Sequence, residues 1–377
     1  MNRVVYLCDW LPPDFGAVGQ YSVLFATERA RRGEHVTLVG LSTRGHSVET
    51  VQEGDGSVET IRIPASRYDK SRLFRRALWT LRTNLALLWR ARAAVRRANE
   101  ILFTGSPPFL IHFVVPLNLL LRKCVTYRIT DFHPECLIAE LGRTPPPLRW
   151  FHRLTIALRR RVDRFEVLGE DQRRRLEELG IPSDRIQLKR DPSPVAIHSD
   201  VEPLPVPETL RGRFVLLYSG NFGVAHDHET FLEGYRRHHR EGSGRVGLWL
   251  NATGAKVALL ERTLVSDGLP YHRSELLPLE DLPRILVAAQ AHLITLRNEF
   301  VGFVLPSKVY ACIESKRPIL FIGSEESDVH LLCHRALASE RYFQVDTGDP
   351  ENVTHALETM SAKAPVGTAV TFDRPSS

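Results

Sequence analysis

The chain has 377 residues, of which 43% are hydrophobic and 25% are charged, and its formal net charge is +6. This length allows two domains of ordinary size, and the composition is that of a soluble globular protein rather than a disordered or membrane-spanning one. Five scattered cysteines without metal-like spacing favour buried thiols in a reducing compartment over a disulfide framework. The N-terminus reads as a first strand rather than a signal peptide, so we expect a cytoplasmic protein.

The first half of the chain alternates predicted strands and helices. Apolar runs predict strands at 4–7, 35–39, 57–63, 101–104, 126–129, 164–168 and 186–188. Helical periodicity predicts helices at 19–32, 148–162 and 170–179, and one after the turn at 105–108. Such alternation is typical of a doubly wound α/β domain.

A basic segment interrupts this pattern between residues 67 and 97. It carries ten arginines and lysines against a single aspartate, Asp69, with leucines and two tryptophans interleaved. One or two basic amphipathic helices of this kind bind anionic membrane surfaces, so we expect peripheral attachment to the inner membrane face. A solvated helix face is the alternative. Nucleic-acid binding is not expected, because no DNA- or RNA-binding signature accompanies the charge.

A segment with five prolines, 191–208, predicts an extended connector between two domains. After it, strands are predicted at 214–218, 246–250, near 271, 293–296, 319–322 and 342–345. Helices are predicted at 229–239, 256–267, 279–288, 309–314 and from about residue 327. The predicted fold is therefore α/β, with two Rossmann-like doubly wound parallel-sheet domains, 1–198 and 199–377, that face a cleft.

Two loops at predicted strand ends of the first half carry candidate chemistry. Gly16 and Gly19 lie between the first strand and the first helix, and their spacing is not that of a dinucleotide-binding fingerprint. Asp131, His133 and Glu135 follow the strand at 126–129 and are all capable of proton transfer or hydroxyl binding. A plain strand-to-helix turn is the alternative for the glycine pair.

The second half has two further loops of this kind. Gly220 and Asn221 follow its first strand, where glycine lets the backbone approach a phosphate, and His226 could touch that phosphate or cap the loop.

The segment 293–323 is predicted as a strand, a loop, a helix with Ser307 as N-cap, and a second strand. Its loop supplies Arg297, Glu299 and Lys308, and a helix N-terminus at the carboxyl end of a parallel strand favours anions. This chemistry suits a nucleotide diphosphate sugar.

Taken together, four motifs spanning nearly the whole chain resemble glycosyltransferase family 4, the retaining nucleotide-sugar transferases of GT-B architecture. The likeness is greatest to bacterial members that build surface polysaccharides. The motifs are TGSPPF at 104–109, RITDFHPE at 128–135, YSGNFGVAHD at 218–227 and GFVLPSKVYACIESKRPILFIG at 302–323.

The resemblance implies that the C-terminal domain binds the nucleotide sugar. Gly220 and Asn221 would lie against the diphosphate, and Ser307 and Lys308 would meet diphosphate or nucleotide. Arg297 would help to neutralise the diphosphate and His226 could assist, whereas Glu299 would contact the donor sugar.

The N-terminal domain would bind a lipid-linked or polysaccharide acceptor. Asp131, His133 and Glu135 would line that end of the cleft, and Gly16 and Gly19 would form its glycine loop. The candidate catalytic residues are Asp131, His133 and Glu299. The implied reaction is glycosyl transfer with retention, without a protein nucleophile, and with electrostatic stabilisation of the leaving diphosphate. No paired-aspartate metal motif is evident, so neither a metal nor a cofactor is expected.

The sequence departs from the family at Asn221, His226, Ala311 and Lys316, where Arg, Lys, Glu and Gly are usual. These departures leave open a catalytically degenerate partner or scaffold subunit that binds nucleotide sugar without transferring it. An epimerase or phosphorylase on the same architecture is a further alternative, although those classes usually carry a different carboxylate set or a pyridoxal lysine in a longer chain.

Overall fold

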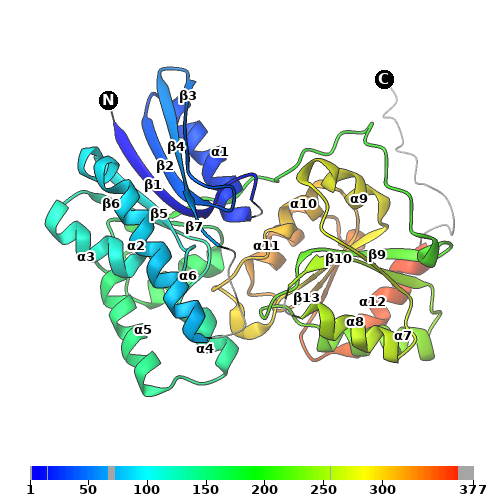
Figure 1. Ribbon diagram of the computed structural model, residues 1–377. Coiled ribbons are helices and arrows are strands. Elements are labelled where there is room, and N and C mark those ends of the chain that lie inside the picture. Colours follow the sequence, from blue (N-terminus) through cyan, green and yellow to red (C-terminus); the bar gives the residue numbers. More distant parts are fainter. Residues whose placement is uncertain (1, 15, 67–72, 255, 364–377) are drawn as a thin grey trace. The chain divides into compact units, whose positions relative to one another are not determined.

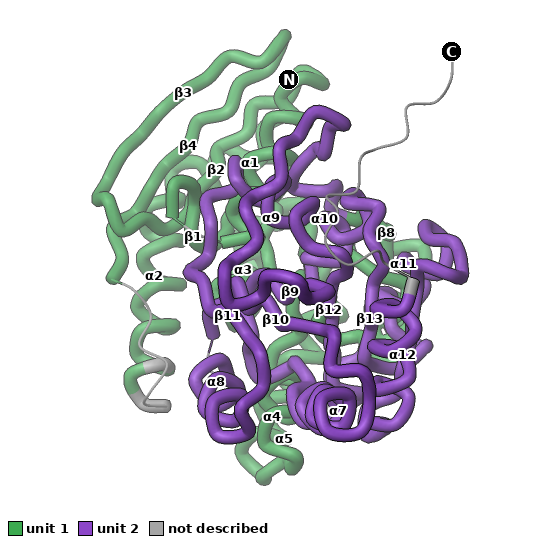
Figure 2. Tube along the Cα trace, turned by 90° about the vertical axis from the view of Figure 1, so that its right-hand side faces the viewer, with its two compact units in different colours: residues 1–190, 302–304 green, residues 191–301, 305–377 purple. Residues whose placement is uncertain are grey.

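The computed structural model describes residues 2–14, 16–66, 73–254 and 256–363. The chain forms two compact units, which Figure 1 and Figure 2 show as ribbon and tube. Unit 1 contains residues 1–190 and 302–304, and unit 2 contains residues 191–301 and 305–377. The units divide at the start of the proline-rich segment, whereas the sequence predicts the boundary at residue 198.

Unit 1 is built on an eight-stranded sheet in the order β3-β4-β2-β1-β5-β6-β7-β8. The strands are β1 (Arg3–Trp10), β2 (His35–Ser42), β3 (Ser47–Glu53), β4 (Gly56–Pro64), β5 (Glu100–Thr104), β6 (Cys124–Ile129), β7 (Arg164–Val167) and β8 (Ile186–Leu188). Seven of them confirm predicted strands. The sequence misses β3, an antiparallel partner of β4, because its side chains are mostly exposed and no apolar alternation marks it.

Helices cover both faces of this sheet (Figure 1). They are α1 (Ala17–Arg31), α2 (Leu73–Arg97), α3 (Ile111–Leu121), α4 (Glu135–Leu141), α5 (Pro146–Arg159) and α6 (Glu170–Glu178). Tyr21 and Phe25 of α1 are buried in a core on one face. Leu87 of α2 and Val114 of α3 are buried in the core on the other. The predicted basic segment is thus one helix from residue 73 onward, and its residues 67–72 lie outside the described part.

Unit 2 has a six-stranded, fully parallel sheet in the order β11-β10-β9-β12-β13-β14. The strands are β9 (Phe214–Asn221), β10 (Val246–Thr253), β11 (Tyr271–Ser274), β12 (Ala291–Thr295), β13 (Ile319–Ile322) and β14 (Tyr342–Val345). All six confirm predicted strands. A parallel sheet needs crossover helices on its faces, and this requirement explains the near-continuous apolar runs of its strands.

The helices of unit 2 are α7 (Glu229–Arg240), α8 (Val257–Ser266), α9 (Leu282–Ala288), α10 (Lys308–Glu314), α11 (Asp328–Ala336) and α12 (Pro350–Lys363). Side chains of α7, α8 and α12 share one core with the sheet, and those of α9 share another with Ala311 of α10. The α12 helix was not predicted, although its Val353 and Leu357 are fully buried and the helix packs against α7.

Three residues of the second half, Gly302–Val304, belong to unit 1. Val304 forms an isolated bridge with Asp131, and the Phe132 amide donates to the Phe303 carbonyl at 3.0 Å. The stretch that follows β6 is therefore held by a segment more than 160 residues further along the chain.

Gly19 is required by packing. A Cβ atom there would lie 1.7 Å from the carbonyl oxygen of Trp10, because α1 passes directly over the end of β1. A Cβ at Gly16 would meet its nearest neighbours at an ordinary 3.5 Å. Close helix–strand packing therefore requires a glycine at position 19, and the acceptor contact of Gly16 and Gly19 stays a prediction.

We predict that Gly19→Ala lowers the free energy of unfolding of unit 1 by about 1–3 kcal/mol, since the added methyl must displace backbone atoms. Urea denaturation followed by fluorescence measures this change. Gln20→Ala, one position along the same helix, is the matched control and should change stability by no more than about 0.5 kcal/mol. Equal stability of the two variants would contradict the packing argument.

Candidate functional site

The first candidate site lies at the carboxyl end of β9 in unit 2. Gly220 there has a φ of +118°, a conformation that side chains rarely adopt. The Nζ atom of Lys308 lies 3.2 Å from the centre of the Tyr218 ring. A Cβ at Gly220 would lie 3.6 Å from Lys308 Cε and 3.8 Å from Nζ. Tyr218 also fixes the loop, because its hydroxyl donates to the Asn221 carbonyl at 2.9 Å.

Lys308 as a whole is half-buried. Its Nζ atom, however, is inaccessible to solvent and has no hydrogen-bond partner among the described residues. Burial lowers the pKa of Lys308 to about 7, against a small opposing effect of Cys312. A buried donor without an acceptor costs roughly 1–3 kcal/mol. An anion next to Gly220 would supply the acceptor atoms and the negative charge that this amine lacks among the described residues.

The helix that begins at Lys308 contributes less than predicted. Ser307 does occupy the N-cap position, but its side chain makes no capping hydrogen bond. The α10 helix has only seven residues, so its dipole is small. The Lys308 amine is therefore the charged group that this short helix brings to the end of β9.

His226 does not match the predicted phosphate contact. Its Nδ1 donates to the Thr295 carbonyl at 2.7 Å, and the side chain is almost fully buried. Burial, and then the charge of Lys308, lower its pKa to about 3. The ring is neutral near pH 7 and supplies no positive charge to a diphosphate. Its hydrogen bond instead ties the β9 loop to the end of β12.

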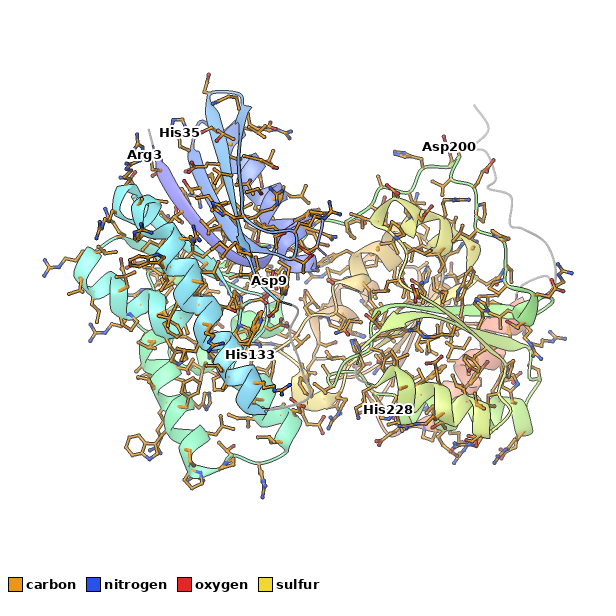
Figure 3. The ribbon with its side chains drawn as sticks, in the orientation of Figure 1. Arg3, Asp9, His35, His133, Asp200 and His228 are labelled. Carbon is orange, nitrogen blue, oxygen red and sulfur yellow. The ribbon has the colours of Figure 1, made fainter. Side chains whose placement is uncertain are left out.

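A cavity of about 370 Å³ opens at the carboxyl edge of the same sheet. Two predicted residues, Arg297 and Glu299, line it, and their side chains contact each other at 3.4 Å. His228 and Lys256 line it as well, and neither was predicted. His228 is labelled in Figure 3. Gly220, Asn221, His226, Ser307 and Lys308 are not among the residues that line this cavity.

The second candidate site is a pair of carboxylates in unit 1. Asp131 follows β6, and Asp9, labelled in Figure 3, lies near the end of β1. Ser106, after β5, donates to Asp9 Oδ2 at 2.6 Å, whereas Asp9 Oδ1 is inaccessible and has no partner within the described residues. Because β5 lies between β1 and β6, the three strand ends bring these side chains to one edge of the sheet.

The two carboxylates influence each other. Burial, and then the charge of Asp9, together raise the pKa of Asp131 to about 6. Burial also raises the pKa of Asp9 to about 6, although the Ser106 hydrogen bond opposes that shift. Groups with such pKa values exchange protons readily near neutral pH, so the pair is suited to general acid–base chemistry or to binding hydroxyl groups.

Sequence reasoning found Asp131 but not Asp9. The sequence pattern is the same at both positions, because each carboxylate directly follows an apolar run that predicts a strand. Asp9 was missed because its partners, Ser106 and Asp131, are about 100 residues away along the chain.

Glu135 is committed to the structure and does not serve as the predicted acceptor ligand. Both of its oxygens accept from the buried Arg159, and His152 contacts one of them at 3.0 Å. Burial raises the pKa of Glu135, but the charge of Arg159 and these hydrogen bonds outweigh burial and hold it at about 2. Arg159 also donates to the His133 carbonyl at 3.0 Å, so this cluster fixes the loop that carries His133 and Asp131.

His133 lies beside aromatic side chains. Its ring centre is 5.7 Å from that of Phe109, which in turn packs edge-on against Phe151 at 5.1 Å. Figure 3 labels His133 in unit 1. Half-exposed rings of this kind can stack against a sugar ring, and the acceptor role of His133 stays a prediction.

The described part of the chain holds neither a metal-binding cluster nor a membrane-spanning helix. No group of three His, Cys, Asp or Glu side chains there is arranged to hold a metal ion. None of the described helices is both long and apolar enough to cross a membrane. The expectation that the protein needs no metal stays a prediction.

Comparison with known proteins identifies the fold. No protein-family model matches the chain. The chain is 23% identical over 346 residues to the probable glycosyltransferase WbjE of Pseudomonas aeruginosa, across 87% of this chain and 82% of that protein. Anabaena Alr3699/HepE in complex with UDP and glucose matches with a TM-score of 0.61 at 9% identity, over 95% and 89% of the two chains.

The glycosyltransferase WaaG, which is involved in lipopolysaccharide biosynthesis, matches with a TM-score of 0.58 at 14% identity, over 96% and 91% of the two chains. The fold is thus the one found in GT-B glycosyltransferases, and the predicted α/β fold class with two Rossmann-like parallel sheets is confirmed. The predicted cleft between the domains stays a prediction.

We predict that Asp9→Asn lowers the pKa of Asp131, because it removes the neighbouring negative charge while burial remains. Carbon-13 NMR of labelled aspartate carboxyls measures this. Ser106→Ala is the matched control and should raise the pKa of Asp9, since it removes a hydrogen bond to the carboxylate.

Both pKa values lie above the ordinary value of 3.8, so the folded state holds more protons than the unfolded state. The free energy of unfolding should therefore fall as the pH rises from about 4 through about 6, and less steeply in Asp9→Asn. An unchanged Asp131 titration in Asp9→Asn would show that the two carboxylates do not interact.

Proposed function

We propose that this protein is a glycosyltransferase that moves a sugar from a nucleotide diphosphate donor, bound by unit 2, to an acceptor bound by unit 1. The observation that carries the proposal is the buried amine of Lys308 beside Gly220, which has no hydrogen-bond partner among the described residues. The fold shared with WaaG and with UDP-bound HepE, and the likeness to WbjE, support the same conclusion.

In this proposal the chemistry is mainly electrostatic. As the sugar–oxygen–phosphorus linkage breaks, negative charge grows on the leaving diphosphate, and an ammonium group fixed in a buried site stabilises that charge. The anion raises the pKa of Lys308 from its value near 7, so the amine becomes fully charged as the donor binds. The backbone at Gly220 can approach the phosphates because no side chain intervenes.

Asp131, supported by Asp9, is proposed to bind the acceptor hydroxyl and to accept its proton. The raised pKa of the pair matches a group that takes up a proton near neutral pH. Transfer with retention, membership of family 4 and a role in building a surface polysaccharide are part of the proposal. They are supported by the motifs of the sequence and by the likeness to a lipopolysaccharide glycosyltransferase.

Donor binding is tested by thermal shift with UDP, GDP, ADP, TDP and CMP and their common sugars, with and without EDTA. We expect one diphosphate family to raise the melting temperature, because a ligand that binds the folded state stabilises it, and we expect EDTA to leave that rise unchanged. Lys308→Met should abolish the rise, whereas Lys316→Met, an exposed lysine just after the same helix, should retain it.

If nucleotide raised the melting temperature of Lys308→Met as much as that of the wild type, Lys308 would not be part of the donor site. A flat result for every nucleotide would reject the donor site itself. Nucleotide binding without any sugar transfer would favour the degenerate partner subunit that the departures at Asn221 and His226 suggest.

The acceptor is proposed to be lipid-linked, with α2 lying on an anionic membrane surface. The outer face of α2 exposes Leu81, Leu85 and Trp89, at 45%, 52% and 66% of their full accessibility. The helix has seven arginines and no acidic residue, and the guanidinium of Arg92 lies 4.4 Å from the Trp89 ring centre. An apolar stripe beside arginines is the pattern of helices that bind in the membrane interface.

We predict that the protein floats with vesicles containing phosphatidylglycerol and not with pure phosphatidylcholine vesicles. The double variant Leu85→Ser/Trp89→Ser should bind about tenfold more weakly, since the buried apolar area is lost. Val48→Ser/Val51→Ser removes two exposed apolar side chains from β3 and is the matched control. Equal flotation of both double variants would contradict the proposed membrane face.

A further inference from the structure

The helix α5 carries a basic and apolar surface that the proposed function does not use. Trp150 and Leu154 lie one turn apart on this helix, and they are exposed to 72% and 50% of their full accessibility. An exposed tryptophan leaves a large apolar area in water, so a contact that covers the ring is favourable. The pair is therefore a candidate contact surface.

The charges close to this pair along the chain are all positive. The stretch 142–161 contains six arginines and no acidic residue. Arg149 and Arg153 are exposed next to Trp150 and Leu154, and their side chains form no ion pair within the described residues. Guanidinium groups beside an apolar stripe fit an anionic surface, because electrostatic attraction and apolar burial then act at one contact.

The α5 helix belongs to the same layer of unit 1 as α2. The α3 helix contacts both of them, and Leu158 of α5 packs against the core that Leu87 of α2 and Val114 of α3 share (Figure 1). Leu119 and Leu120 of α3 are exposed to 58% and 83%. All three helices thus expose large apolar side chains, and none of the three contains an acidic residue. Single exposed apolar residues are ordinary, but their recurrence on three neighbouring helices indicates an interaction surface.

The inner side of α5 lies next to the candidate acceptor residues. The ring of Phe151 stacks on His112 at 4.4 Å and packs edge-on against Phe109 at 5.1 Å between ring centres. Phe109 is in turn 5.7 Å from the ring centre of His133. Because an α-helix with its side chains is about 10–12 Å wide, the outer side of α5 lies within about one helix diameter of these rings.

We propose that α5 is a second membrane-binding helix, and that α2, α3 and α5 bind one anionic membrane surface as a layer. Trp150 and Leu154 enter the boundary between headgroups and acyl chains, and Arg149 and Arg153 contact lipid phosphates. A lipid-linked acceptor then reaches His133 from the membrane on which α5 lies. This inference rests on the lipid-linked acceptor of the proposed function, but it concerns a different helix and has its own test.

Vesicle flotation tests the proposal with phosphatidylglycerol vesicles and with pure phosphatidylcholine vesicles. We expect Trp150→Ser/Leu154→Ser to bind the anionic vesicles about tenfold more weakly than the wild type, since apolar area is no longer buried. Leu259→Ser/Val265→Ser removes two exposed apolar side chains from α8, at 38% and 65%, and should bind as the wild type does.

The arginines are tested separately. Arg149→Gln/Arg153→Gln should also weaken binding, and the loss should be larger at low salt than at high salt, because salt screens exposed charges. Loss of the same size at both salt concentrations would contradict the electrostatic part of the proposal.

Insertion of the ring is measured by tryptophan fluorescence. Lipids with brominated acyl chains quench tryptophans that enter the apolar region, so we expect Trp150→Phe to remove part of the quenching seen in the wild type. Trp249→Phe, in the core of unit 2 at 4% exposure, should leave the quenched intensity unchanged. Unchanged quenching in Trp150→Phe would overturn the proposal, because the ring would not enter the membrane.

The remaining outcomes separate this inference from the proposed function. Equal flotation of Trp150→Ser/Leu154→Ser and the wild type would overturn the role of α5 and leave α2 and the donor site in place. A wild-type dimer that becomes monomeric in the same variant, without vesicles, would also overturn it, because α5 would then bind a second copy of the chain. Flotation through α5 in a protein that binds no nucleotide would reject the proposed donor site and leave the membrane surface intact.

Discussion

The amine of Lys308 is the constraint around which the candidate donor site is arranged. It is buried against the Tyr218 ring, with no hydrogen-bond acceptor among the described residues, and Gly220 passes over it without a side chain. The Tyr218 hydroxyl holds the same loop through the Asn221 carbonyl, so one residue supports both the amine and the backbone that approaches the ligand. A buried amine without a hydrogen-bond acceptor costs free energy, and the contact with the Tyr218 ring offsets part of that cost.

Much of the fold could be predicted, because a parallel sheet buried on both faces leaves a strong apolar signal in each strand. The exceptions have physical reasons. The β3 strand is an exposed edge with few apolar side chains, and its position is fixed by β4. The α12 helix begins at a proline after a turn, and its buried side chains are defined by their contacts with α7.

The candidate sites were predictable only in part. The resemblance pointed to Asp131 and Lys308, whose roles stay predictions. It also pointed to Glu135 and His226, whose side chains are bonded to Arg159 and to the Thr295 carbonyl. Asp9 and His228 were missed. Each depends on neighbours from strands and loops that are distant in sequence, and no local pattern encodes those neighbours.

The departures from the family pattern at Asn221 and His226 need not mean lost activity. The charge of Lys308 already reaches His226 and lowers its pKa, which shows that the two positions share one electrostatic environment. A second lysine at 226 would bring another ammonium group into a buried region where the first has no anionic partner, at a considerable cost in free energy. A neutral histidine avoids this repulsion and still ties the loop to β12. Lys308 thus remains the buried amine at the end of β9, and the neutral His226 adds no second charge beside it.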